Sequence, residues 1–196
     1  MKTLEIIGYK RDDFGKKHSI ILRREANTPG ILYGGATNIH FYTPMALLKN
    51  LVYTPEVHFV NLIIENKEYK CILQEIQFHP VSEMIMHIDM LQIASDKQIK
   101  MNIPIKIVGN SPGVIKGGNL VAKVKKVPIM ALPQNMPEFV EIDISSLDIG
   151  QMVRVADVQK ERYKVLKPSR LPIVSVEMSR ALKSSASKDS VKAAKK

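Results

Sequence analysis

The side chains best suited to chemistry in this sequence are His87 and Asp89, which are separated by one isoleucine. Successive side chains of a β-strand point to opposite faces of the sheet, so residues two apart share a face. The alternation of residues 84–90 is typical of such a strand, and it sets His87 beside Asp89. An imidazole and a carboxylate in this arrangement can pair with each other, hold part of a metal site, or form hydrogen bonds with a ligand.

The strand that carries this pair is expected to form a hairpin with the segment before it. Residues 74–78 precede a turn at residues 80–83, which Pro80 opens. Folding the hairpin brings Gln74 near Asp89, within one register step. The alternation divides the second strand into a core face with Met84, Met86, Ile88 and Met90, and an outer face with Ile85, His87 and Asp89.

A His-x-Asp pair is also half of a site in which two histidines and one carboxylate bind iron. The sequence has five histidines, and the nearest to this pair, His79, lies beyond Pro80 at the far end of the hairpin. The sequence contains no nucleophile elbow, phosphate loop or Gly-rich dinucleotide turn. We therefore predict that the protein is not an enzyme and has no catalytic residue, metal site, cofactor or small-molecule substrate. A barrel metalloenzyme that uses His87 and Asp89 is the distant alternative.

The charge of the chain points to a polyanionic partner. Its formal net charge is +10 and its pI is about 9.6, which favours nucleic acid, although a soluble protein that is merely basic has the same composition. Cations cluster near the N-terminus: Lys10, Arg11, Lys16, Lys17, Arg23 and Arg24. An RNA-binding surface needs cations for phosphates and hydrogen-bonding side chains for base edges, and the first half of the chain has both.

We predict two groups of RNA-binding residues. The cations Arg11, Lys16, Lys17 and Arg23 contact phosphates, and Tyr33, Gln74, Gln77, His87 and Asp89 contact bases or ribose. The sequence lacks tryptophan and is 6% aromatic, which disfavours a stacking platform for single strands, so a folded RNA is the expected ligand. Purely structural roles stay open for two of these residues. His87 can be a structural partner of Asp89, and Tyr33 can be a structural residue of the strands that form the fold.

The fold that positions these residues is predicted to be all-β with short helices. Residues 1–94 are expected to form a six-stranded β-barrel, because closure removes the exposed edges of antiparallel strands. Residues 95–179 are expected to form a second, β-rich domain, and residues 180–196 a disordered tail rich in Lys, Ala and Ser. A chain of 196 residues suits two domains of modest size.

Three local patterns refine this picture. Thr43 is expected to cap a short helix that Pro44 opens. Residues 20–22, which are Ile, Ile and Leu, are expected to anchor a turn beneath the N-terminal cations. Residues 109–118 carry several glycines and are expected to form a loop between strands without a helix.

The remaining composition bears on the compartment. Cys71 is the single cysteine, so the sequence allows neither an internal disulfide nor a zinc site made of cysteines. The sequence has no run of about 18 apolar residues, and its N-terminus is unlike a signal peptide. We expect a cytoplasmic protein with no membrane partner.

These motifs together resemble one family, the large-subunit ribosomal protein numbered twenty-five, and in particular its longer form, the general stress protein Ctc type. The motifs that carry the resemblance are Arg11, Gly15-Lys16, Leu22-Arg23, Pro29-Gly-Ile-Leu-Tyr-Gly34, Gln74-Glu-Ile-Gln-Phe-His-Pro80 and His87-Ile-Asp89. The longer form is indicated by the motifs Lys49-Asn-Leu-Val-Tyr-Thr-Pro55, Gly109-Asn-Ser-Pro-Gly113 and Gly117-Gly-Asn119. The resemblance covers the chain except for its tail.

The resemblance implies a ribosomal protein that binds 5S ribosomal RNA at an internal loop and its flanking helix. It implies that the positions of Arg11, Lys16, Tyr33, Gln74, His87 and Asp89 contact this RNA. It also implies that the second domain packs on neighbouring ribosomal surfaces and that neighbouring large-subunit proteins are partners of the chain. One departure stands out, because Ile20 and Ile21 occupy positions where the family usually has cations. A tRNA-binding or stress-related RNA-binding protein that uses the same barrel surface is the alternative.

Overall fold

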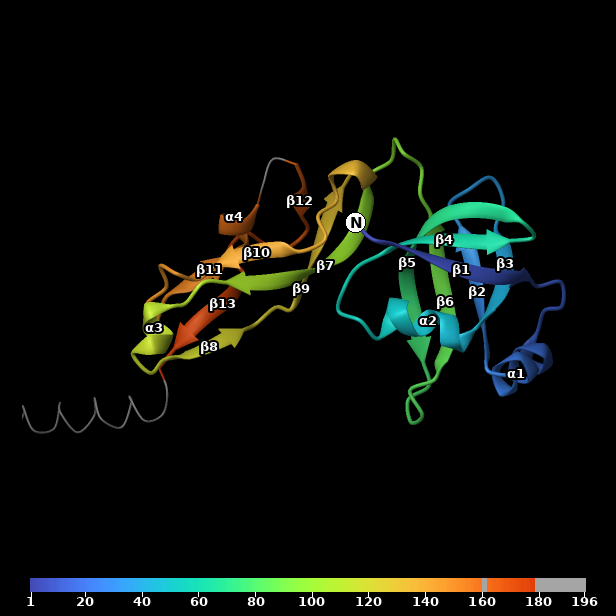
Figure 1. Ribbon diagram of the computed structural model, residues 1–196, viewed down its shortest axis with the longest axis horizontal. Helices are drawn as coiled ribbons and strands as arrows, with labels where there is room; N and C mark the ends of the chain where they lie inside the picture. The colour runs from blue at the N-terminus through green and yellow to red at the C-terminus, as the bar shows by residue number, and fades with distance from the viewer. Residues whose placement is uncertain (160–161, 179–196) are drawn as a thin grey trace, which may run out of the picture. The chain divides into compact units, whose positions relative to one another are not determined.

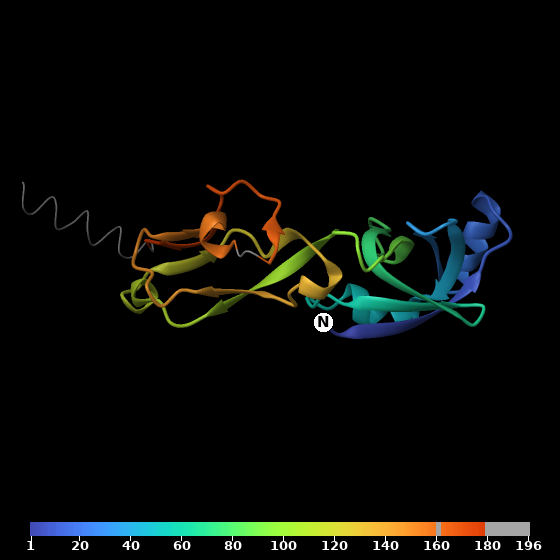
Figure 2. The same ribbon diagram turned by 90° about the horizontal axis from the view of Figure 1, so that it is seen from above.

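The structure, a computed structural model, describes residues 1–159 and 162–178. The described chain forms two compact units: residues 1–101 with 131–138, and residues 102–130 with the segment from Phe139 onwards. The first unit is built on a closed barrel of six strands, and the second has smaller sheets (Figures 1 and 2). The predicted all-β fold with an N-terminal six-stranded barrel is confirmed. The predicted tail at residues 180–196 lies outside the described residues, and the boundary at residues 94 and 95 stays a prediction.

The barrel strands follow one another around the wall in the order β1, β3, β2, β6, β5, β4. Their bounds are β1 Thr3–Lys10, β2 Asn27–Tyr33, β3 Ile39–Pro44, β4 Phe59–Ile64, β5 Lys67–Phe78 and β6 Ile85–Gln92. Two helices join them, α1 Lys16–Arg24 and α2 Met45–Val52. The prediction of an antiparallel barrel was only partly correct, because β1 pairs with β4 and β2 pairs with β6 in parallel.

The barrel interior holds a continuous apolar core. Phe41, Leu62, Ile88 and Met90 have no exposed surface, and α2 adds Leu48 to the same cluster. Cys71 is also part of this core. Its burial raises the pKa of the thiol to about 12, so it stays a neutral thiol that fills space in the core.

The β5–β6 hairpin contains two β-bulges that its sequence alternation does not reveal. Register shifts occur between Leu73 and Glu75 and between Gln77 and Phe78, so Glu75 lies opposite Asp89 and Gln77 opposite His87. The second shift makes Met86 the extra residue, because Phe78 pairs with Ile85. The predicted faces were therefore wrong at the start of β6. Ile85 is fully buried and Met84 is largely exposed, whereas His87 and Asp89 lie on the outer face as predicted.

Thr43 does not cap a helix. It lies in β3, and its buried hydroxyl donates a hydrogen bond to the carbonyl of Ile7 on β1 at 2.8 Å. Helix α2 begins one residue after Pro44, with no side-chain cap. Strand β3 therefore includes Thr43 and Pro44, which the sequence pattern assigned to the start of the helix. The Thr43 hydroxyl finds its hydrogen-bond partner on the neighbouring strand β1 instead of at a helix end.

Residues 20–22 are part of a nine-residue helix rather than a turn. Only Leu22 is buried, whereas Ile20 and Ile21 lie largely exposed on α1. The positions that depart from the family pattern are therefore surface positions, and Leu22 is the buried residue of the helix.

Within the residues that the structure describes, the second unit has two sheets. The first has the strand order β10, β7, β9, β12 and the second the order β11, β13, β8. The strand bounds are β7 Ile99–Val108, β8 Asn119–Ala122, β9 Lys126–Ala131, β10 Val140–Asp143, β11 Met152–Arg154, β12 Lys164–Val165 and β13 Pro172–Glu177. Its short helices are α3 Pro112–Ile115 and α4 Val155–Val158, whereas η1 Pro133–Asn135 belongs to the first unit. The predicted β-rich character of this region is confirmed.

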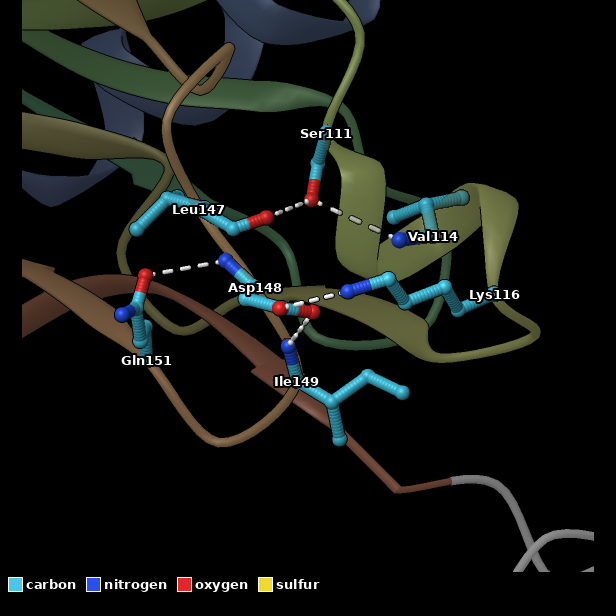
Figure 3. A network of polar contacts seen from close by, with 7 residues as sticks. All are labelled: Ser111, Val114, Lys116, Leu147, Asp148, Ile149 and Gln151. Atoms are coloured by element: carbon cyan, nitrogen blue, oxygen red, sulfur yellow. Dashed lines mark hydrogen bonds and ion pairs between the residues drawn. The ribbon is translucent and has the colours of Figure 1, made fainter.

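The loop at residues 109–118 contains one helical turn, α3, which the sequence analysis did not predict. Ser111 is its N-cap and Pro112 its first residue, and the Ser111 side chain accepts a hydrogen bond from the backbone N–H of Val114. Figure 3 shows how the neighbouring segment holds this turn, since Lys116 Nζ lies 2.7 Å from the Asp148 carboxylate. The hydrogen bond from Lys116, followed by one from the backbone N–H of Ile149, lowers the pKa of Asp148.

Candidate nucleic-acid interface

The outer face of β6 presents an imidazole and a carboxylate in close contact. His87 Nδ1 lies 2.7 Å from Asp89 Oδ1, and the two side chains are 30% and 29% exposed. A carboxylate only accepts hydrogen bonds, so Nδ1 of His87 is the atom that can donate in this contact. The Nε2 atom of His87 and the second oxygen of Asp89 are then available to a ligand.

Neighbouring strands add more polar groups to this face. Glu75 and Gln77 on β5 lie opposite Asp89 and His87, respectively, and both are exposed. Gln74, the extra residue of the first bulge, is exposed next to them, so the predicted nearness of Gln74 to Asp89 holds to within one residue. Glu75 was not predicted as a site residue, because the placement of the bulge decides which residue of β5 faces Asp89.

Tyr33 lies at the end of β2 beside the same carboxylates. Strand β2 pairs with β6 in parallel, with Ile31 opposite Asp89 and Tyr33 opposite Leu91. Burial raises the pKa of the Tyr33 phenol, and the negative charges of Asp89 and Glu75 raise it further. The phenol therefore stays protonated and can donate a hydrogen bond.

Helix α1 brings cations to the edge of this surface. Lys16 and Lys17 are exposed in its first turn, and Arg23 is half-buried in its last turn. Arg23 Nε donates a hydrogen bond to the carbonyl of Met86 at 3.1 Å, one residue before His87. This bond ties the helix with the predicted phosphate-binding residues to the strand with the predicted base-binding residues.

Arg11 shapes the loop that leads from β1 into α1. Its Nε atom donates to the carbonyl of Asp13 at 2.8 Å, and Nη2 donates to Ser19 Oγ at 2.9 Å. A guanidinium carries five N–H donors, so three are left for a phosphate. Arg11 therefore has a structural role in addition to the RNA contact that we predict for it.

The geometry gives no support to a metalloenzyme. Within residues 1–159 and 162–178, no three His, Cys, Asp or Glu side chains converge on a position that suits a metal ion. His79, the nearest histidine in sequence, instead accepts hydrogen bonds through Nδ1 from the backbone N–H groups of Val81 and Ser82. Among the described residues, no helix is both long and apolar enough to span a membrane.

Comparison with known proteins decides the family. Residues 6–90 match the model of the Ribosomal L25p family, and residues 98–180 match that of the ribosomal protein TL5 C-terminal domain. Over 196 residues, the whole of both chains, the sequence is 55% identical to the large ribosomal subunit protein bL25 of Amoebophilus asiaticus. The chain belongs to the bL25 family. It is also 45% identical over 183 residues to the bL25 protein of Cytophaga hutchinsonii, which covers 93% of this chain and 95% of that protein.

Membership in the bL25 family confirms the resemblance inferred from the motifs. The bL25 proteins are structural components of the large ribosomal subunit rather than enzymes, and the chain is accordingly a ribosomal protein of the cytoplasm. The match to the TL5 C-terminal domain accounts for residues 98–180 and corresponds to the longer form that the motifs indicated.

Proposed function

We propose that the barrel binds 5S ribosomal RNA within the large subunit, through the outer face of β2, β5 and β6 and through helix α1. The observation that carries this proposal is the partly exposed pair of His87 and Asp89 on the outer face of β6, with Nδ1 and Oδ1 2.7 Å apart. The family resemblance implies the identity of the RNA and its internal loop. Folded RNA suits this surface because its groups are spread over several strands and a helix rather than along one channel.

The polar face supplies the base-specific part of recognition. Asp89 accepts from an exocyclic amine or a base N–H, and His87 Nε2 accepts from an amine or a ribose hydroxyl. The protonated Tyr33 phenol, whose pKa is raised, donates to a ribose or base oxygen. Gln74 and Gln77, both exposed, have donors and acceptors for neighbouring positions.

The cations supply affinity. Arg11, Lys16, Lys17 and Arg23 contact phosphates, and the link from Arg23 to the Met86 carbonyl keeps those contacts in register with the base-reading groups. Phosphate contacts position the protein, whereas base contacts specify the sequence. We further propose that the domain at residues 95–179 contacts neighbouring large-subunit proteins.

A competition gel shift tests the choice of RNA. The full chain is expected to bind 5S ribosomal RNA more tightly than tRNA at every salt concentration, because only the first RNA satisfies the polar face. Lys16→Ala is expected to weaken the binding of both RNAs and to reduce the slope of log affinity against log salt concentration by about one. Equal affinity of the wild-type chain for the two RNAs would count against 5S recognition and favour a general RNA-binding protein.

A further inference from the structure

A cluster of rings, most of them exposed, lies on the outside of the barrel on β1, β3 and the loop that follows β1. We call Tyr9, Phe14, His40 and Tyr42 the aromatic patch. Phe14 is 62% exposed and Tyr9 is 50% exposed. Large apolar side chains rarely gather on the surface without a partner, and the sequence analysis gave this cluster no role.

Neighbouring contacts hold the rings in fixed positions. The Tyr9 and Tyr42 rings are stacked, with centroids 5.4 Å apart and an interplanar angle of 26°. The Phe14 ring meets His40 edge to face at 5.0 Å, and the Arg11 guanidinium carbon lies 5.7 Å from its centroid. Arg11 is itself fixed by Asp13 and Ser19. The rings are therefore ordered before any ligand arrives, which lowers the entropic cost of binding.

Strand register connects the aromatic patch with the polar face of β6. His40 on β3 lies opposite Ile31 on β2, and Ile31 lies opposite Asp89 on β6. Residues in register on neighbouring strands share a face of the sheet, so His40, Ile31 and Asp89 form one row along the outside of the barrel. An RNA that lies on His87 and Asp89 can extend along this row to the aromatic patch.

The charges around the patch favour a base over a phosphate. Asp12 lies 3.7 Å from Lys10 Nζ, and Asp13 is exposed in the same loop. These carboxylates partly offset the charge of Lys10 and do not oppose a neutral base, and Arg11 remains the phosphate contact of this loop. Every nucleobase has a π-face that stacks on an aromatic ring, with a contribution that does not depend on sequence.

We propose that the aromatic patch binds an unpaired nucleobase of the same RNA, stacked against Phe14 beside Tyr9. This inference rests on the proposed binding of 5S ribosomal RNA. In this arrangement the ring of Phe14 adds affinity through stacking, and the neighbouring polar face of β6 supplies specificity through hydrogen bonds.

Affinities of full-length variants for 5S ribosomal RNA, measured over a range of salt concentrations, test the proposal. Phe14→Leu is expected to weaken binding on the order of tenfold with no change in salt slope, because a stacking contact releases no counterions. Phe14→Tyr, which keeps a ring, is expected to retain the wild-type affinity. Tyr53→Leu is the matched control, because Tyr53 is 57% exposed but lies outside the patch.

The outcomes separate this inference from the proposed function. If Phe14→Leu and Tyr9→Leu bind as wild type while Asp89→Asn binds more weakly, the RNA contacts the polar face only and the aromatic patch is not part of the interface. If the wild-type chain does not prefer 5S ribosomal RNA over tRNA, both proposals are overturned. Weakened binding by Phe14→Leu but not by Tyr53→Leu supports the stacked base.

Discussion

Replacing Asp89 by asparagine is expected to weaken binding of the full chain to 5S ribosomal RNA by about 1–3 kcal/mol, the range of one good base contact. The substitution turns one of the two carboxylate oxygens into an NH2 donor and leaves a single acceptor, so the side chain can no longer accept both from His87 Nδ1, 2.7 Å away, and from the RNA. It also raises the net charge of the chain by one, which strengthens nonspecific attraction to any RNA. Loss of a base contact lowers the affinity, whereas the added net charge raises it. Gel-shift titration shows directly which of the two effects prevails.

A double-mutant cycle with His87→Ala sharpens this prediction. If the pair reads the RNA as one unit, Asp89→Asn combined with His87→Ala is expected to cost little more than either change alone. Glu68→Gln is the matched control, since Glu68 is an exposed carboxylate at the other end of β5. Its removal should leave binding unchanged or slightly stronger. Tighter binding by Asp89→Asn would contradict the role assigned to this carboxylate.

Replacing Gly30 by alanine is expected to destabilise the barrel by about 1–3 kcal/mol, the usual cost of overpacking a core. A Cβ atom at Gly30 would lie 2.6 Å from Ile88 Cγ1, 2.9 Å from the Ile88 carbonyl oxygen and 2.9 Å from the Phe41 ring. The carbonyl belongs to the β6 backbone and cannot rotate away, so β2 and β6 must move apart. Thermal unfolding measures the loss of stability.

The same substitution also tests how the site is positioned. Ile88 lies between His87 and Asp89, so a displaced β6 moves both away from Tyr33 on β2 and weakens RNA binding. Gly35→Ala is the control, because a Cβ at Gly35 meets only the flexible end of the Gln92 side chain. A Gly30→Ala variant with wild-type melting temperature and wild-type affinity would show that the close approach of β2 to β6 has no such role.

Much of the barrel could be predicted because alternation reports which strands have a buried face. Residues 60–64 and 88–90 alternate between buried and partly exposed side chains. The turn at Glu65 and Asn66 joins β4 to β5 with both residues at positive φ. Alternation does not report strand direction. The parallel pairings of β1 with β4 and of β2 with β6 therefore follow from closure of the barrel, not from any local pattern.

The misassigned residues have local physical causes. Ile85 is buried because the bulge at Met86 inserts one residue into β6, and an extra residue reverses the faces on one side of it. Thr43 is of a residue type that commonly caps helices, but its hydroxyl donates a hydrogen bond to the carbonyl of Ile7 on the neighbouring strand β1. The turn α3 could have been predicted from Ser111 and Pro112, which are a cap residue followed by a proline at the first helical position.

The candidate site was predictable in its residue types and only partly in its geometry. His87 and Asp89 share the outer face because they lie beyond the bulge, where the alternation is regular. Glu75 escaped prediction because its position opposite Asp89 depends on the other bulge. The aromatic patch escaped prediction because Tyr9 and Phe14 are far in sequence from His40 and Tyr42 and come near them only through the pairing of β1 with β3.

Nuclear magnetic resonance of the histidine imidazoles tests the central claim most directly. With labelled full-length chain and the His87 signals assigned through His87→Ala, titration with 5S ribosomal RNA is expected to shift the His87 signals in step with binding. His58 is an internal reference, because it is buried and is assigned no RNA contact. Saturated RNA binding with unchanged His87 signals would contradict the account.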